Sequence, residues 1–306
     1  MEDIRAEHFR YSSTLSFARS LFTAAEGKEL FDRRFFFPSA VSAYYSLFHL
    51  AGALILAYCS RNLSAPICVT VLKWQDGEQR HAPANTEFPV PDPAQGISHN
   101  DPPKFLKNQT PGIVGSLGER GIKGTLRDMR EFVSYAPRLR SDGRRTILYS
   151  ACQYTPDEFS ASLDEHLNRM NECFHEAMQW LNERSLDEVH RRLFTSDFIL
   201  YEFDGLGVYH GEAIRKRAGN IYCSLCEAEG VDWKVYRPDP DPKTWRDPSA
   251  EEGERRRHQR IVDSWTAPAQ GGPSNRTLLS HLQGDNQAGA KSDLPVFRAP
   301  GSTLRS

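Results

Sequence analysis

Residues 38–60 read PSAVSAYYSLFHLAGALILAYCS, and this stretch decides the fold. The run from Ala40 to Cys59 contains no Lys, Arg, Asp or Glu. Apolar residues recur at helical spacing along two neighbouring stripes, Ala40, Tyr44, Leu47, Ala51, Leu54 and Tyr58 on one and Val41, Tyr45, Phe48 and Ile55 on the other. A helix with two apolar stripes is covered on both sides. The pattern therefore predicts a central, buried helix over 38–60, with Pro38 in its first turn.

The same run is long enough to cross a membrane. Its serines, His49, Gly52 and three tyrosines are spread around the helix, however, and polar groups make poor lipid-facing residues. We therefore expect a core helix and no membrane partner. The first ten residues carry three acidic side chains and no apolar run, so we expect no signal peptide and a cytoplasmic location.

Further helices are expected on both sides of this one along the chain. Residues 4–26 carry one amphipathic stripe, and Gly27 is the expected stop. A helical pattern resumes near Leu117 and continues through Leu126, Met129 and Val133 until Pro137. The last long helix, 156–183, follows Thr155-Pro156-Asp157-Glu158, which is a capping box with Pro at the first helical position. Six side chains on these stripes are expected in the core: Leu47, Phe48, Leu54, Leu163, Met170 and Phe174.

The rest of the chain differs in composition and in its hydrophobic pattern. Eight prolines lie between residues 62 and 117 and forbid long helices, so 62–116 is interpreted as a Pro-rich insertion with a strand over Ile67–Trp74. The segments Phe198–Phe203, Val208–His210 and Val231–Tyr236 look like strands, with a short helix before the last. We therefore expect a helical bundle over 1–61 and 117–185, a small mixed α+β appendage over 196–237, and a mostly disordered tail over 238–306.

Charge composition limits the kind of nucleic-acid site that the chain can have. Lys and Arg total 38 and Asp and Glu total 40, so the net charge of −2 excludes a globally basic binder and requires a local patch. Residues 127–145 form a local basic patch with a balance of +3, and hold Arg127, Arg130, Arg138, Arg140, Arg144 and Arg145. Arginine forks bind phosphate, and Tyr135 offers a ring for a base. The alternative is a solvated loop between helices.

Two short strings carry a resemblance to a known family. The string Ser42-Ala43-Tyr44-Tyr45-Ser46-Leu47-Phe48-His49 and the segment Leu126–Tyr135, with Arg130-Glu131 at its centre, resemble the signatures of the HEPN superfamily of helical bundles. The resemblance implies an antiparallel four-helix bundle, often a homodimer. Many members are metal-independent ribonucleases with an Arg-x4-6-His motif, and Arg130 stands at its arginine position. No His follows at the required spacing, and Ser134 replaces the family's Asp.

The sequence thus favours a HEPN-like module that associates with RNA or a partner protein, in a toxin–antitoxin or defence setting, with a degenerate ribonuclease site. The partner would be RNA, a cognate antitoxin or a nucleotidyltransferase-like protein. One alternative is an active metal-independent ribonuclease in which Arg130 acts with a histidine from outside the motif, His49 or His99. Another is a purely structural interaction protein. No cofactor or metal is expected, because Cys223 and Cys226 form a lone CxxC pair without a second pair.

Overall fold

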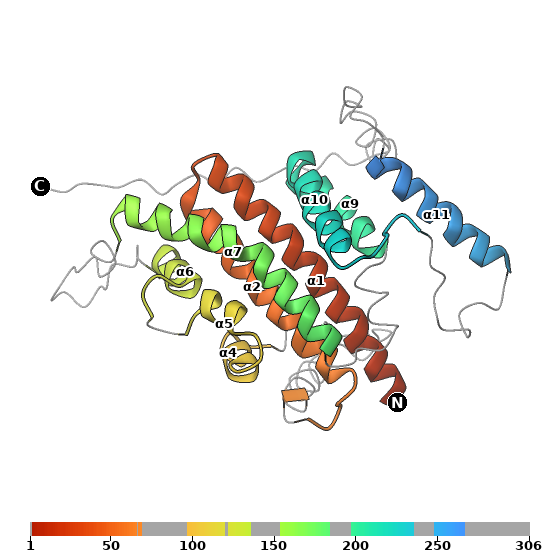
Figure 1. The fold of residues 1–306 in the computed structure, drawn as a ribbon, viewed down its shortest axis with the longest axis horizontal. Helices are drawn as coiled ribbons and strands as arrows, with labels where there is room; N and C mark the ends of the chain where they lie inside the picture. The colour runs from red at the N-terminus through yellow and green to blue at the C-terminus, as the bar shows by residue number, and fades with distance from the viewer. Residues whose placement is uncertain are drawn as a thin grey trace, which may run out of the picture. The chain divides into compact units, whose positions relative to one another are not determined.

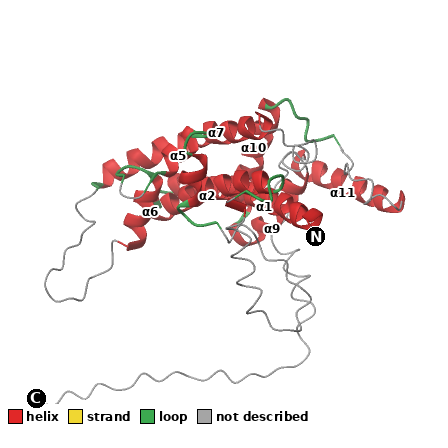
Figure 2. Ribbon diagram, turned by 90° about the horizontal axis from the view of Figure 1, so that it is seen from below, coloured by secondary structure: helices red, strands yellow, loops and turns green. Residues whose placement is uncertain are grey.

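The computed structural model describes residues 2–65, 67–68, 97–119, 122–135, 154–183, 197–235 and 248–266, and these residues are mainly helical, as expected. The helices are α1 (Glu2–Asp32), α2 (Phe36–Cys59), α4 (Asp101–Leu106), α5 (Pro111–Leu117), α6 (Leu126–Tyr135), α7 (Pro156–Glu183), α9 (Asp197–His210), α10 (Glu212–Ala228) and α11 (Pro248–Thr266). No described residue belongs to a β-strand. By their contacts, residues Met1–Trp265 form one compact unit and Thr266–Ser306 another. In the first unit, α1, α2 and α7 run side by side (Figure 1, Figure 2).

The contact between α1 and α2 is made by small residues. Ser13 Oγ donates to the carbonyl of Ala53 at 2.8 Å, and Ser39 Oγ donates to the carbonyl of Gly27 at 2.7 Å. Between them, Ser20 and Ser46 each donate to the other's carbonyl, at 2.8 and 2.9 Å. The residue numbers of the three pairs add up to the same value, so the two helices are antiparallel. We call these six residues the serine seam: Ser13, Ser20, Gly27, Ser39, Ser46 and Ala53.

Gly27 lies inside α1 and does not end it, so the expected stop is wrong. A Cβ atom at this position would lie 3.3 Å from the backbone nitrogen of Ala43 and 3.5 Å from the carbonyl oxygen of Ser39. The glycine is thus a packing position, where the absence of a side chain lets α2 approach α1 closely. Helix α1 continues to Asp32, beyond the predicted end at residue 26.

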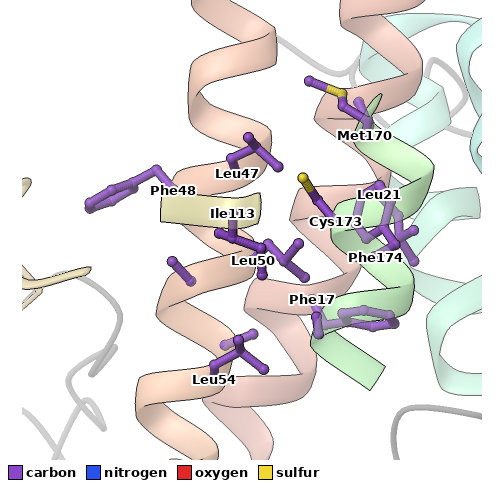
Figure 3. Close-up of a cluster of buried hydrophobic side chains, with 14 of the residues drawn as sticks. Phe17, Leu21, Leu47, Phe48, Leu50, Leu54, Ile113, Met170, Cys173 and Phe174 are labelled. Carbon is purple, nitrogen blue, oxygen red and sulfur yellow. The ribbon is translucent and has the colours of Figure 1, made fainter. Parts of the chain in front are cut away.

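Helix α7 covers the groove between α1 and α2. Its capping box is formed as expected: the amide of Thr155 donates to the carboxylate of Glu158 at 2.8 Å, and the amide of Glu158 donates to Thr155 Oγ1 at 3.2 Å. The bounds of α7 agree with the predicted helix. The six predicted core side chains are all buried. Figure 3 shows Leu47, Phe48 and Leu54 of α2, and Met170 and Phe174 of α7, in one apolar cluster with α1 residues.

Two short helices of the Pro-rich region, α4 and α5, pack beside α2 and α7. The carboxylate of Glu176 in α7 accepts the amides of Gly112 and Ile113 at 3.0 and 2.8 Å, which are N-terminal donors of α5 with no partner inside that helix. Trp180 Nε1 donates to Gln109 Oε1 at 2.9 Å. The absence of a long helix between 62 and 117 agrees with the proline pattern within the described residues. Residues 67–68 are helical, and the remainder of the expected strand over 67–74 lies outside the described residues.

The expected strands of the appendage are wrong. The two that lie within residues 198–210 are both part of α9, and residues 231–235 form turns. Ile199, Leu200 and Phe203 are buried, a helical spacing that turns one face of α9 toward α1, where the ring of Phe203 lies 6.1 Å from that of Phe22. The periodicity of a short apolar run does not distinguish a strand from a helix, so its secondary structure depends on the element against which it packs. The expected short helix is present as α10.

Within the expected, mostly disordered tail over 238–306, residues 248–266 form helix α11. The helix carries ion pairs one turn apart, Arg256 with Glu252 at 2.9 Å and Arg257 with Glu254 at 3.3 Å. It also presents a stripe to its neighbours: His258 and Ile261 are buried, and Val262 and Trp265 are partly buried. The other residues of the expected tail lie outside the described residues.

Among the described helices, α2 is the one whose length and composition would allow it to cross a membrane. Most of its apolar window, 78%, is buried inside the structure. The core helix of a bundle passes the same test of length and composition, and α2 contacts α1, α6 and α7.

The serine seam gives a test of the packing. Ser46→Leu should lower the free energy of unfolding by about 2–4 kcal/mol, because a larger side chain must fit a fully buried contact and one hydrogen bond is lost. Ser46→Ala should cost only about 1 kcal/mol. Urea denaturation followed by circular dichroism measures both. Ser224→Leu, on an exposed position of α10, is the control and should change stability by less than about 0.5 kcal/mol. Equal effects at positions 46 and 224 would contradict a tight seam.

Candidate functional site

The two sequence strings that resemble HEPN signatures meet in space. The guanidinium carbon of Arg130, on α6, lies 5.3 Å from the ring centre of Tyr44 and 5.7 Å from that of Tyr45, both on α2. Arg130 Nη2 donates to the hydroxyl of Tyr45 at 3.3 Å. A guanidinium over two aromatic faces gains cation–π attraction, which holds the cation in place while part of it stays exposed.

His99 joins this contact from a different part of the chain. It precedes α4, and its Nδ1 lies 2.8 Å from the hydroxyl of Tyr44. Its ring centre is 4.6 Å from that of Phe48, and His99 is partly exposed. We call the set Tyr44, Tyr45, Phe48, His99 and Arg130 the Arg130 cluster. His49 lies at its edge, with its ring centre 6.2 Å from that of Tyr45.

The electrostatics of the cluster keep His99 and Tyr44 uncharged at neutral pH. Burial lowers the pKa of His99 below its ordinary value, and the cations Arg130 and Arg127 lower it further. Burial raises the pKa of Tyr44 to about 12 despite the opposing effect of the same arginines. At neutral pH the site therefore contains a neutral imidazole, a protonated phenol and a fixed cation, which are groups able to exchange a proton beside an anion.

Arg127 holds the segment of chain that carries His99. Its Nη2 donates to the side-chain oxygen of Asn100 at 3.1 Å, and its Nε lies 3.1 Å from the carboxylate of Glu131. Only 10% of the Arg127 side chain is exposed. Arg127 thus links α6 to Asn100 and acts as a positioning residue for the neighbouring His99.

Helix α6 is itself fixed to α7 by hydrogen bonds around Gly124, which has a φ of +85°. The carbonyl of Gly124 accepts from His166 Nε2 at 2.7 Å and from Ser162 Oγ at 3.2 Å. Its amide donates to the hydroxyl of Tyr154 at 2.7 Å, and that hydroxyl donates to the carboxylate of Asp128 on α6. This group of residues sets the position of α6, and so the position of Arg130 over α2.

The structure does not describe the side chains of five other candidate residues. Arg138, Arg140, Arg144 and Arg145 lie outside the described residues. Tyr135 is the last residue of α6, and its side chain lies outside them as well. Within the cluster, His99 carries the weakest sequence signal, because nothing in the pattern of the Pro-rich region shows that its chain returns to α2.

Two other patterns have ordinary structural surroundings. Arg169 and His175 of α7 also have Arg-x5-His spacing. Arg169 lies 4.0 Å from both Glu165 and Glu172, and His175 lies 3.6 Å from Glu229, so the two residues have different partners. Burial raises the pKa of the Cys223 thiol to about 12, so this thiol of the CxxC pair stays protonated in α10. Within the described parts of the chain, no three His, Cys, Asp or Glu side chains are grouped as metal ligands.

No protein-family model, curated protein or solved structure matches this chain. The function of the chain is therefore inferred from the chemistry of the Arg130 cluster and its surroundings.

The lowered pKa of His99 is directly measurable. In a pH titration followed by NMR, its imidazole should titrate below the ordinary value of about 6.5. Arg130→Gln should raise that pKa, because one of the cations that oppose protonation is removed, while burial should keep it from rising fully. Arg256→Gln, on the exposed face of α11, should leave it unchanged. A His99 that titrates normally and ignores both substitutions would show that the imidazole is not held beside Arg130.

Proposed function

We propose that the chain is a HEPN-like RNA-binding module in which Arg130 contacts a phosphate of single-stranded RNA. The observation that carries this proposal is the position of Arg130 over Tyr44 and Tyr45. The two strings that suggested the family lie far apart in sequence, and their central residues are in contact. Helices α1, α2, α6 and α7 would be the four helices of the bundle, in the order that the resemblance implies.

The chemistry of the cluster suits a phosphate. A guanidinium presents several N–H donors in one plane and binds phosphate oxygens in pairs. Tyr45 orients this fork and leaves part of Arg130 exposed. The chain as a whole has a net charge of −2, so binding would depend on this local site and on nearby cations rather than on a general positive field.

The proposed module would also have the protein partners that the resemblance implies. It would form a homodimer and would serve in a toxin–antitoxin or defence system with a cognate antitoxin or a nucleotidyltransferase-like protein. In such a pair, the partner protein would compete with RNA for the Arg130 cluster or would deliver RNA to it.

A second candidate function, metal-independent ribonuclease, is favoured by His99. The family's motif histidine is absent, but the neutral imidazole of His99 lies in the same cluster as Arg130. A base at this position would take the proton of the ribose 2′-hydroxyl, and the resulting oxygen would attack the phosphorus. The P–O bond to the 5′-oxygen would then break to leave a 2′,3′-cyclic phosphate, and the 5′-oxygen would leave as a hydroxyl with the proton that the imidazole had accepted. Arg130 would stabilise the charge that develops on the phosphate.

The binding proposal predicts a loss of affinity without a change in sequence preference. Arg130→Gln should weaken binding to oligonucleotides of different sequence alike, because phosphate contacts carry no sequence information. It should also reduce the slope of log affinity against log salt by about 0.7, the value for one phosphate on a single strand. Filter binding across a salt series measures both.

The control is Arg256→Gln, which removes the same charge from an exposed site on α11 and should leave binding unchanged. A variant with Ser in place of Arg138, Arg140, Arg144 and Arg145 measures what those four add. If they contribute three or four contacts, the slope should fall by about 2 to 3. The absence of any RNA binding at low salt would overturn the proposed function and leave an interaction protein.

The ribonuclease candidate predicts a separation of cleavage from binding. His99→Asn should reduce cleavage of a labelled RNA by about 10²- to 10⁴-fold, the usual contribution of a general acid or base, while affinity changes little. The acid limb of the pH–rate profile should lie below a pH of about 6.5, the ordinary pKa of histidine, because the pKa of His99 is lowered. His175→Asn, on α7, is the matched control. RNA that is bound and left intact by the unmodified protein would restrict the function to binding.

A further inference from the structure

A cavity of about 460 Å³ opens at the end of the first unit where the α1–α2 connection meets the start of α7 and the end of α6. Its walls are mostly aromatic, and they include Phe35, Phe37, Phe132, Tyr154 and Phe159 together with Arg34. The volume is within the range of sites for small ligands or parts of larger ones. None of these residues belongs to the Arg130 cluster.

The rings form an ordered wall. The ring centre of Phe37 lies 5.4 Å from that of Phe159 and 6.0 Å from that of Phe132, and both pairs are edge to face. The rings of Tyr154 and Phe132 are 5.5 Å apart in the same manner. These contacts fix the rings, whereas 53% of Phe37 and 57% of Phe35 remain exposed. Large exposed rings beside a cavity mark a surface for a flat, apolar group.

The rim of the cavity carries charges of both signs. Arg34, held at a φ of +64°, belongs to the lining. Lys123 Nζ lies 5.3 Å from the ring centre of Tyr154. The nearby carboxylates of Asp128 and Glu158 are hydrogen-bonded, to Tyr154 and to Thr155 respectively. Arg34 and Lys123 supply cations for an occupant that combines an aromatic ring with a negatively charged backbone.

The cavity and the Arg130 cluster both use residues of α2. Phe37 and Tyr45 are eight residues apart on one helix, which corresponds to about 12 Å at roughly 1.5 Å per residue. That distance is covered by three to four nucleotides of a stacked strand at roughly 3.4 Å each. Helix α6 supplies a residue to both places, Arg130 to the cluster and Phe132 to the cavity.

We propose that this aromatic cavity binds an unpaired base of the RNA strand whose phosphate contacts Arg130. The inference rests on the proposed RNA-binding function and names what it would recognise: a single strand with at least one base turned out of its stack. Sequence-tolerant binding of single strands uses such aromatic surfaces, because every base has a flat face. The cavity thus supplies stacking, and the cluster supplies the phosphate contact.

The test compares ordinary and abasic RNA. With a short single-stranded oligonucleotide, Phe37→Ala and Phe35→Ala should each weaken binding by about 5- to 150-fold, the range for loss of one stacked base. Phe37→Trp should retain binding because it keeps a flat face. The unmodified protein should lose a similar factor when the strand carries abasic sites, whereas Phe37→Ala should no longer distinguish the two strands.

The control is Tyr209→Ala, which removes an aromatic side chain of α9 that is 87% exposed and should not affect binding. Circular dichroism verifies that each variant is folded, and Phe35→Ala serves if Phe37→Ala is not. Binding that depends on Arg130 but is equal for all folded cavity variants and for abasic RNA would overturn the cavity proposal and leave the proposed function standing. Absence of RNA binding in the unmodified protein would overturn both.

Discussion

The close contact of α1 with α2 is the constraint on which the rest of the structure depends. Serine hydroxyls that donate across to the opposite carbonyls replace the large side chains usually found between helices, and Gly27 replaces a side chain altogether. These serines are buried, so each hydroxyl needs a partner, and the carbonyls of the opposite helix provide it. Helices in contact through small residues leave their large apolar residues to face outward from the pair.

This arrangement determines what covers α2. The large residues on its two remaining sides must be buried by other elements, and α7 and α6 do this on adjacent faces. The side toward α7 is apolar, as the buried cluster of Leu47 and Leu54 of α2 with Met170 of α7 illustrates. The side toward α6 carries Tyr44 and Tyr45, whose hydroxyls need polar partners. His99 and Arg130 meet that need, so the same packing that completes the core creates a polar site at its edge.

The elements that the sequence predicts correctly are those whose signal is local. The capping box at Thr155, the stripe of α7 and the apolar run of α2 each specify a helix without reference to other parts of the chain, and all three are present. The pattern is misleading at Gly27 and at Gly207, which lies between the two expected strands of residues 198–210, because a glycine has the same letter at a turn and at a close contact. A Cβ at Gly207, for example, would lie 2.8 Å from the side chain of Arg215. The partner that gives each glycine its role is not visible in the local sequence.

The candidate site likewise has parts that the local sequence shows and parts that depend on distant contacts. Arg130 and the two tyrosines are visible as short strings, but their contact depends on the bonds of Gly124 to Tyr154 and His166, which no local pattern shows. His99 depends further on the path of the Pro-rich region and on the bond from Arg127 to Asn100. Helix α6 is therefore the element through which the two proposed binding sites are linked. It is held through Asp128 and Tyr154 and carries both Arg130 and Phe132, so a shift of α6 would move the cation and one wall of the aromatic cavity together. A strand that bound at both places would in turn favour one position of α6, because its binding energy would be greatest only when the two are correctly spaced.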